Sequence, residues 1–289
     1  MSVTVGEATG STGPIGPSGS PASPVSPGTA FKALLLRDFY VLRKNLKEFI
    51  PRTIIQPFLL VFVFTYVFPK IGQGIGPSSL DPQAAGQFST MLIAGVLGSV
   101  ILFQGVQAVA LPLVQEFGYT KEIEDRVLAP LPVEFVAIEK VVSGALQCMI
   151  AAVIVFPIAL WVPATPVNIQ FHWAILLAFA PLACVAASSL GLFFGTAFDP
   201  RTVPLLFGIV VVPLTFLGCI YFPWQSLSTI PWLQWLVLVN PLVYISEGFR
   251  AALTNVDHMS LAVVFPVLTA FTALFLWRGI VGFKKRVLA

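Results

Sequence analysis

Six long stretches of apolar residues constrain the fold of this chain more than any other feature. A helix needs about 20 predominantly apolar residues to cross the roughly 30 Å hydrocarbon core of a membrane. Backbone N–H and C=O groups find no water in that core, so such stretches cross it as helices. The sequence therefore predicts six transmembrane helices, at about residues 54–68, 88–114, 141–162, 173–198, 203–221 and 261–281.

The composition agrees with a membrane protein and excludes an ordinary soluble enzyme. Charged residues make up 10% of the 289 residues and hydrophobic residues 57%, whereas soluble domains carry about 25% charged residues. The predicted fold class is an all-α polytopic membrane protein. Proline inside a helix removes a backbone hydrogen bond, so kinks are expected at Pro112, Pro157, Pro181 and Pro213.

Two segments precede the first predicted span. Residues 1–30 are rich in Ser, Pro and Gly and hold one charged residue, Glu7, which predicts a disordered cytoplasmic tail ahead of a transmembrane domain over 31–289. Residues 31–49 combine an apolar stripe with a basic opposite face, which predicts a helix lying in the membrane interface. A helix of a soluble domain is the alternative, but no such domain surrounds it. The apolar stripe consists of Phe31, Leu35, Phe39, Leu42, Leu46 and Phe49.

The basic residues predict the orientation in the membrane. If the N-terminus is cytoplasmic, 14 of the 16 Lys and Arg residues fall on the cytoplasmic side, and only Lys70 and Arg250 fall on the other. Basic residues accumulate on the cytoplasmic side of multi-pass proteins. We therefore expect both termini in the cytoplasm and a location in a bacterial-type plasma membrane.

Motifs for catalysis and metal binding are missing from the sequence. It holds no GxxxxGK[ST] phosphate loop, no HExxH and no GxSxG. Cys148, Cys184 and Cys219 each stand alone in an apolar run, so neither a zinc site nor a disulfide is predicted. The spans also carry almost none of the ionisable groups that ion-coupled transporters use as relays. We therefore expect that the chain is not an enzyme and that another polypeptide supplies the energy for any transport.

A charged segment at 116–140 separates the second and third predicted spans and holds nine charged residues. Thr120 is expected to cap a short helix that Pro130 stops, with Glu122 in the first turn, where an acid suits the helix dipole. A short charged helix in a cytoplasmic loop suits docking into a cleft of a soluble partner. A solvated connector helix is the alternative.

Residues 222–250 are too polar for a regular span and too apolar for an exposed loop. Pro223, Trp232 and Trp235 lie where rings would meet the lipid headgroups. Asn240 followed by Pro241 predicts a helix start, because the Asn side chain caps free amides and the proline ring presets the first turn. We expect two short helices that re-enter the membrane from its outer face.

Small residues at helical spacing predict close contacts between spans. Ala94 and Gly98 lie in the second predicted span, and Ala187, Gly191 and Gly195 in the fourth. Gly and Ala are common in membrane spans in any case, so positions without a contact are the alternative.

Three runs of sequence, in this order, resemble the permease subunit of ABC-2-type exporters such as the daunorubicin and multidrug exporters. They are EFGYTKEIEDRVLAPLP at 116–132, FLGCIYFP at 216–223, and NPLVY at 240–244 ahead of Arg250. The resemblance implies a half-transporter that pairs with a second permease, identical or different, and is driven by two copies of an ATP-binding subunit. ATP and Mg²⁺ would belong to that partner. This chain would bind no cofactor and no nucleic acid.

The resemblance also implies roles for particular residues. The segment that couples the permease to the ATPase would contain Glu116, Thr120, Glu122, Ile123, Asp125, Arg126 and Pro130. An outer gate would contain Pro223, Trp232, Trp235, Asn240 and Pro241, with a purely structural aromatic belt as the alternative. A substrate path at the dimer interface would contain Gln104, Gln107 and Phe207. Hydrogen bonding between helices is the alternative for the two glutamines.

The expected function is export of a hydrophobic or amphipathic molecule, such as a drug, an antibiotic or a lipid-like compound. The fifth predicted span is almost wholly apolar, which favours such a molecule over a hydrophilic sugar chain. One alternative is an exporter of lipid-linked polysaccharide, which would need a wider path with more aromatic residues. Another is a membrane scaffold that transports nothing.

Overall fold

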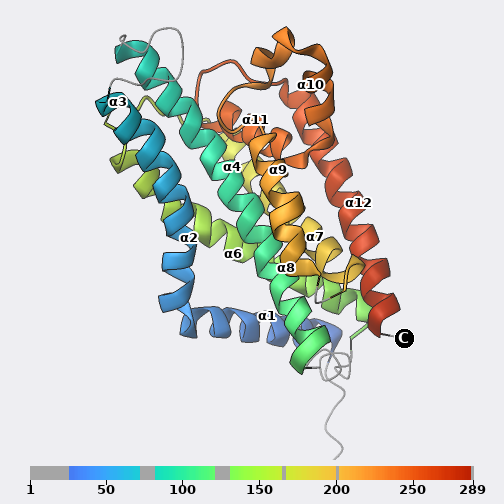
Figure 1. Ribbon diagram of the computed structural model, residues 1–289. Coiled ribbons are helices and arrows are strands. Elements are labelled where there is room, and N and C mark those ends of the chain that lie inside the picture. The colour runs from blue at the N-terminus through green and yellow to red at the C-terminus, as the bar shows by residue number, and fades with distance from the viewer. Residues whose placement is uncertain (1–25, 72–81, 121–130, 165–166, 200–201, 288–289) are drawn as a thin grey trace, which may run out of the picture.

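The structure is a bundle of helices that run between two ends (Figure 1). It is a computed structural model that describes residues 26–71, 82–120, 131–164, 167–199 and 202–287. Every regular element among these residues is helical, which confirms the predicted all-α membrane fold. The predicted tail falls on residues 1–30, of which 1–25 lie outside the described residues.

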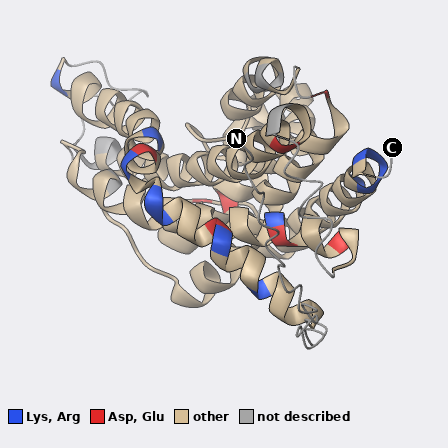
Figure 2. Ribbon diagram, turned by 90° about the horizontal axis from the view of Figure 1, so that it is seen from below, with Lys and Arg blue, Asp and Glu red and all other residues tan. Residues whose placement is uncertain are grey.

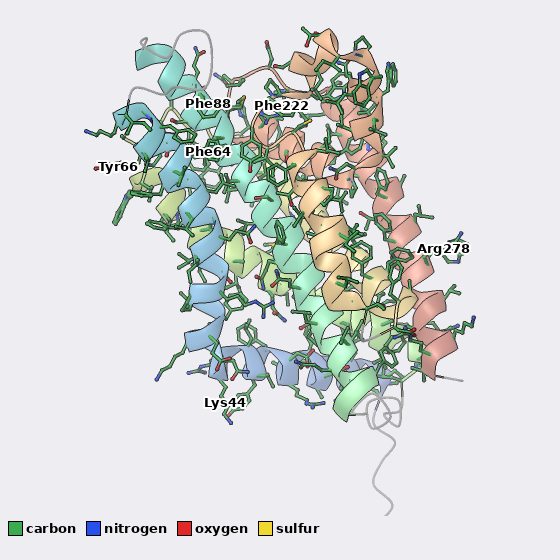
Figure 3. The ribbon with its side chains drawn as sticks, in the orientation of Figure 1. Lys44, Phe64, Tyr66, Phe88, Phe222 and Arg278 are labelled. Atoms are coloured by element: carbon green, nitrogen blue, oxygen red, sulfur yellow. The ribbon has the colours of Figure 1, made fainter. Side chains whose placement is uncertain are left out.

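Helix α1 (Pro27–Lys44) lies across one end of the bundle, below the helices in Figure 1. Ser26 caps it by accepting a hydrogen bond from the Thr29 amide, and its basic residues follow one another along the helix in Figure 2. At Asn45 the chain turns into α2 (Leu46–Val61). The helix predicted at 31–49 thus begins four residues earlier and ends at Lys44. The Lys44 side chain points away from the bundle at this corner (Figure 3).

Five helical segments among the described residues are long and apolar enough to cross a membrane. In the first, η1 (Phe62–Val67) and α3 (Phe68–Lys70) continue α2, and in the second, η2 (Glu116–Thr120) continues α4 (Pro82–Gln115). The other three are α6 (Val133–Trp161), α7 (Trp173–Ala197) and α12 (Leu261–Val287). These five confirm the first four and the last of the predicted spans.

The fifth predicted span is shorter than the sequence predicts. It consists of α8 (Val203–Leu206), η3 (Phe207–Val211) and α9 (Val212–Phe216). These fourteen residues rise about 20 Å at 1.5 Å each, so they do not cover a 30 Å core. Helix ends after Phe216, and Cys219 then adopts a positive φ of 52°, which turns the chain toward α11.

The segment predicted to re-enter the membrane lies at the opposite end, above the bundle in Figure 1, and forms short helices with a sharp bend. It contains η4 (Trp224–Thr229), α10 (Pro231–Leu236), η5 (Val237–Val239) and α11 (Pro241–Leu253). The chain bends by 96° between Val239 and Pro241. Asn240 caps α11 as predicted, because its Oδ1 accepts a hydrogen bond of 2.9 Å from the Leu242 amide. We call the two ends of the bundle the α1 end and the α10 end.

Small residues let α4 pack closely against α7 and α11 at the centre of the bundle. A Cβ at Gly191 would lie 2.9 Å from the Gly105 carbonyl oxygen, and one at Gly195 would lie 3.0 Å from Leu113. A Cβ at Gly98 would lie 3.2 Å from Ser246 of α11. The helix contacts predicted at Gly98, Gly191 and Gly195 are therefore confirmed, and Ala187 likewise meets Gly105.

Candidate functional site

A groove between α2 and α4 is the first candidate site. Both helices contribute polar and apolar side chains to its lining. From α2 these are Arg52, Thr53, Gln56, Pro57 and Leu60, and from α4 they are Ser99, Val100, Phe103, Gln104 and Gln107. Two residues of the predicted substrate path, Gln104 and Gln107, thus lie together in one groove.

Hydrogen bonds from α2 hold both glutamines. Arg52 Nε donates to Gln107 Oε1 at 3.0 Å, and the Arg52 guanidinium donates to the same oxygen a second time through Nη2. Thr53 Oγ1 donates to Gln104 Oε1 at 3.4 Å. Hydrogen bonding between helices was the alternative role for the two glutamines, and the structure shows these bonds. The same two residues also line the groove. Sequence reasoning treated Arg52 only as a marker of orientation.

Aromatic rings continue the same face toward the α10 end. The ring centroid of Phe64 lies 5.3 Å from those of Phe68 and Tyr221, and Tyr221 lies 6.4 Å from Phe216. Figure 3 labels Phe64, Phe88 and Phe222 in this upper part of the bundle. The face of α2 and α4 is therefore polar near the α1 end and aromatic near the α10 end.

Charged residues meet at the α1 end around Lys140 of α6. This side chain is 4% exposed, and its Nζ lies 2.7 Å from Glu116 Oε1 and 3.5 Å from Asp38 Oδ2. It therefore connects α6 with the end of α4 and with α1. The sequence placed Lys140 in a loop at 116–140, but η2 covers 116–120 and α6 begins at Val133. That prediction was wrong at both edges, because helical structure extends into the segment from each side and brings Glu116 and Lys140 into contact.

The end of α12 joins this set of charges. Lys284 pairs with Glu134 of α6. Arg286 donates to the Phe198 carbonyl at 2.5 Å, and its guanidinium carbon lies 5.5 Å from the centre of the Phe117 ring. Ion pairs, a hydrogen bond and a cation–π contact therefore link the α1 ends of α4, α6, α7 and α12, and residues 121–130 connect α4 with α6 along the chain.

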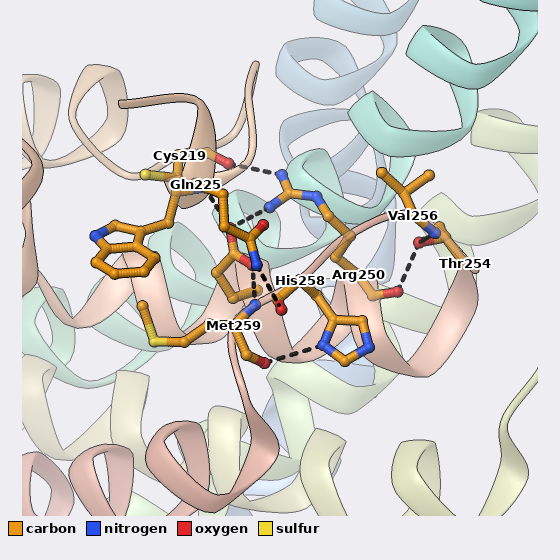
Figure 4. A network of polar contacts seen from close by, with 9 residues as sticks. Cys219, Gln225, Arg250, Thr254, Val256, His258 and Met259 are labelled. Carbon is orange, nitrogen blue, oxygen red and sulfur yellow. Dashed lines mark hydrogen bonds and ion pairs between the residues drawn. The ribbon is translucent and has the colours of Figure 1, made fainter. Parts of the chain in front are cut away.

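A second polar cluster lies near the α10 end and is fully buried (Figure 4). Glu247 accepts hydrogen bonds of 2.8 Å from the backbone amides of Trp224 and Met259, and it pairs with Arg250 at 2.5 Å. Arg250 also donates to the Cys219 carbonyl at 2.8 Å. Arg250 was counted only as a residue of the non-cytoplasmic side, and the structure shows that it is 0% exposed. Sequence reasoning missed Glu247, although its three-residue spacing from Arg250 on a helix was a usable signal.

Comparison with known proteins decides the family. A family model described as ABC-2 type transporter matches residues 29–254. The chain belongs to the ABC-2 type transporter family. Among known proteins, this permease is similar to the inner membrane transport permease YadH of Escherichia coli K12, of E. coli O157:H7 and of Shigella flexneri. Each is 26% identical over 230 residues, which cover 78% of this chain and 84% of the relative.

The family has two consequences for this permease. It is the membrane subunit of a transporter, located as a multi-pass protein in the cell membrane. It works with an ATP-binding subunit, because ABC-2 permeases are driven by such partners. The resemblance seen in the sequence is thereby confirmed.

The structure places only part of the predicted coupling segment of the permease. Glu116 is 5% exposed and contacts Lys140. Thr120 ends η2, and its side chain lies outside the described part of the chain. Glu122, Ile123, Asp125, Arg126 and Pro130 also lie outside the described residues.

The residues predicted for the outer gate divide into two groups. Asn240 and Pro241 are buried at the start of α11, where the Asn240 amide also donates to the Leu214 carbonyl at 2.6 Å. Trp232 and Trp235 of α10 are 69% and 71% exposed. These two rings therefore stand on the outside of the single chain.

Two further features of the permease concern Phe207 and metal binding. Phe207 begins η3, but its side chain is outside the described set. In the part of the chain that the structure describes, no group of three His, Cys, Asp or Glu side chains is placed to bind a metal ion. The three cysteines are buried free thiols.

Proposed function

We propose that the permease is one half of the membrane path of an ATP-driven exporter for hydrophobic or amphipathic molecules such as drugs, antibiotics or lipids. The α1 end and both termini face the cytoplasm, because the basic residues of α1 and of the end of α12 gather there. ATP and Mg²⁺ are bound by the partner ATPase, and this chain binds neither.

The observation that carries the proposal is the polar groove within an otherwise apolar exposed face. The groove lies between α2 and α4, and α8 to α9 continues this face beside α4 (Figure 1). An apolar stripe with a spacing of four, three and four residues runs along α8 to α9. It consists of Leu205, Ile209, Val212 and Phe216, which are 64%, 61%, 44% and 63% exposed.

A second copy of the permease would cover this face and enclose the groove. The substrate path then runs along Gln104 and Gln107, with Phe207 beside it, toward the aromatic rings near the α10 end. The outer gate forms where Trp232 and Trp235 of the two copies meet. Pro223, before η4, and Asn240 and Pro241, at the start of α11, fix the ends of the segment that carries these rings. Apolar and aromatic walls suit a lipid-like or drug-like molecule better than a sugar chain.

The segment around 116–130 transmits the movement of the ATPase. Its ends are fixed to α4 and α6, and both helices meet at Lys140. A push on this segment would therefore move α4, which lines the groove, together with α6. This connection explains how hydrolysis on another chain opens a path in this one.

The test replaces Ile123 with Asp, which places a charge where an apolar side chain docks. We expect Ile123→Asp to lose co-purification with the ATP-binding subunit and to reduce substrate-stimulated ATP hydrolysis at least about tenfold, since a desolvated unpaired charge costs several kcal/mol. Lys44→Asp, which adds the same carboxylate to exposed α1, is the control and should keep both properties. Retained co-purification and transport in Ile123→Asp would overturn the coupling role.

The same preparation separates an exporter from a scaffold. The wild-type complex is reconstituted in liposomes and tested for ATP-dependent movement of a fluorescent amphiphile between leaflets. Movement that needs ATP supports the exporter. A complex that assembles with its ATPase yet moves no amphiphile and no lipid-linked sugar would favour the scaffold.

A further inference from the structure

Among the described residues that line the groove, Arg52 is the only charged one, and its guanidinium carries only hydrogen-bond donors. The Oε1 atoms of Gln104 and Gln107 already accept hydrogen bonds from α2. The NH2 groups of the two glutamine side chains remain free to donate hydrogen bonds to a ligand. Arg52 also has N–H groups left, because a guanidinium carries five N–H donors and no acceptor. The residues that line the groove include no Asp or Glu. A set of donors beside a positive charge is complementary to an anion rich in acceptors, such as a phosphate or a carboxylate.

The positive charge of the groove lies nearer the α1 end than its apolar residues do, and polar Gln56 and Ser99 lie among those apolar residues. Arg52 lies six residues after the start of α2 at Leu46, which places it about 9 Å from the α1 end at 1.5 Å per residue. Gln107 faces it from the lower part of α4. The apolar residues lie farther from the α1 end: Pro57 and Leu60 on α2, and Val100 and Phe103 on α4.

This order matches an amphipathic molecule that stands in the leaflet next to α1. Its headgroup would lie at the depth of Arg52, near the membrane interface, and its hydrocarbon chain would follow the apolar wall toward the middle of the bilayer. An arginine at this depth can reach a headgroup without crossing the hydrocarbon core.

We propose that the groove binds amphipathic molecules with an anionic phosphate or carboxylate head, with Arg52 and the amides of Gln104 and Gln107 holding the head. The hydrocarbon chain lies against Leu60, Val100 and Phe103. This inference rests on the proposed function, because it names the class of substrate that the exporter takes up from the leaflet beside α1.

The test measures binding to the full-length permease in a neutral maltoside detergent, without ATPase or nucleotide. The probes are fluorescent phosphatidic acid and fluorescent phosphatidylcholine with the same acyl chains, followed by fluorescence anisotropy. We expect the wild type to bind phosphatidic acid at least about tenfold more tightly, because charge-assisted hydrogen bonds are the strong ones. Arg52→Gln should bring the two affinities close together, and Arg52→Lys should keep part of the preference.

A matched control separates the groove from the general basic charge of this end. Arg43 is an exposed residue in the last turn of α1, so Arg43→Gln removes the same charge outside the groove and should keep the preference. Equal loss in Arg43→Gln, or an unchanged preference in Arg52→Gln with an unchanged melting temperature, would overturn the proposal.

Free phosphate distinguishes a headgroup site from an amphiphile site. Inorganic phosphate in large excess should displace the labelled phosphatidic acid poorly, because it has no chain to bury against the apolar wall. Displacement as effective as that by unlabelled phosphatidic acid would overturn the amphipathic part of the proposal. The binding assay contains no ATPase, so its result is independent of the Ile123→Asp test. Loss of the preference for phosphatidic acid would overturn this inference alone, and retained coupling in Ile123→Asp would overturn the proposed coupling role alone.

Discussion

At the scale of single residues, two pairs of oppositely charged buried side chains stand out among the described residues, Lys140 with Glu116 and Arg250 with Glu247. Taking a charge out of water costs several kcal/mol, and a partner with good geometry offsets that cost. Glu247 and Arg250 meet this condition at 0% exposure, with further hydrogen bonds to Trp224, Met259 and Cys219. Their pairing joins α11 to the start of η4 and to the chain before α12, so its main effect is to fix the geometry of the α10 end.

The bonds of this cluster predict an unequal response to mutation. Glu247→Leu leaves the Arg250 guanidinium and two backbone amides without their acceptor, whereas Arg250→Met leaves the Glu247 carboxylate with two N–H donors. We expect Glu247→Leu to cost about 3–5 kcal/mol and Arg250→Met to cost less. The double variant should be more stable than Glu247→Leu alone. Thermal unfolding in detergent measures all three.

Arg278→Met on exposed α12 provides the control for this comparison. It removes the same charge from a side chain that points outward in Figure 3 and should leave the melting temperature nearly unchanged. A larger loss in Arg250→Met than in Glu247→Leu would show that the carboxylate is not the centre of the cluster.

Local signals predict single residues well, whereas contacts between distant segments escape them. Asn240 was predicted as a cap because a cap and its amide lie two residues apart. The contact of Lys140 with Asp38 joins segments that only the folded bundle brings together, and Arg52 gains its meaning only beside Gln107. A charged side chain in an apolar chain therefore predicts that another polar side chain pairs with it, but the sequence does not identify that side chain.

At the scale of elements, close packing of α4 against α7 organises the bundle. Helix association in membranes relies on van der Waals contact, so small residues at the interface bring the backbones together. The spacing of glycines in the sequence predicted this contact. The short fifth span escaped prediction, because it ends before a cysteine with φ of 52°, a backbone conformation that non-glycine residues seldom adopt.

A methyl group at Gly191 should destabilise the permease. Its Cβ would lie 2.9 Å from backbone atoms of Gly105 and Val106, which cannot move aside as a flexible side chain could. We expect Gly191→Ala to cost about 1–3 kcal/mol through overpacking, seen as a lower melting temperature in detergent. Gly208→Ala is the matched control, since a Cβ there meets nothing within 4 Å. Equal melting temperatures for both variants would contradict the close contact.

At the scale of the whole molecule, the proposed path needs a second copy of the permease. The apolar runs, the basic residues and the order of motifs were sufficient to predict the fold and the family. They were not sufficient to predict the groove, because its lining alternates between two helices and has no sequence motif. Figure 1 shows α8 and α9 beside α4, which forms the groove together with α2, and in the proposed dimer a second copy would cover both the groove and the exposed stripe of α8 to α9.

Cysteine cross-linking tests this arrangement. Two copies related by a two-fold axis bring the same residue of each copy together near that axis. We therefore expect Ile209→Cys and Phe216→Cys, 61% and 63% exposed in the native chain, to form disulfide-linked dimers in native membranes treated with a mild oxidant. The native cysteines are buried and should not react. Val153→Cys on α6 is 72% exposed in the native chain but lies on another helix face, so it should stay monomeric. Dimers from Val153→Cys at the same yield, or none from either α8 to α9 position, would mean that this face meets lipid rather than a second permease.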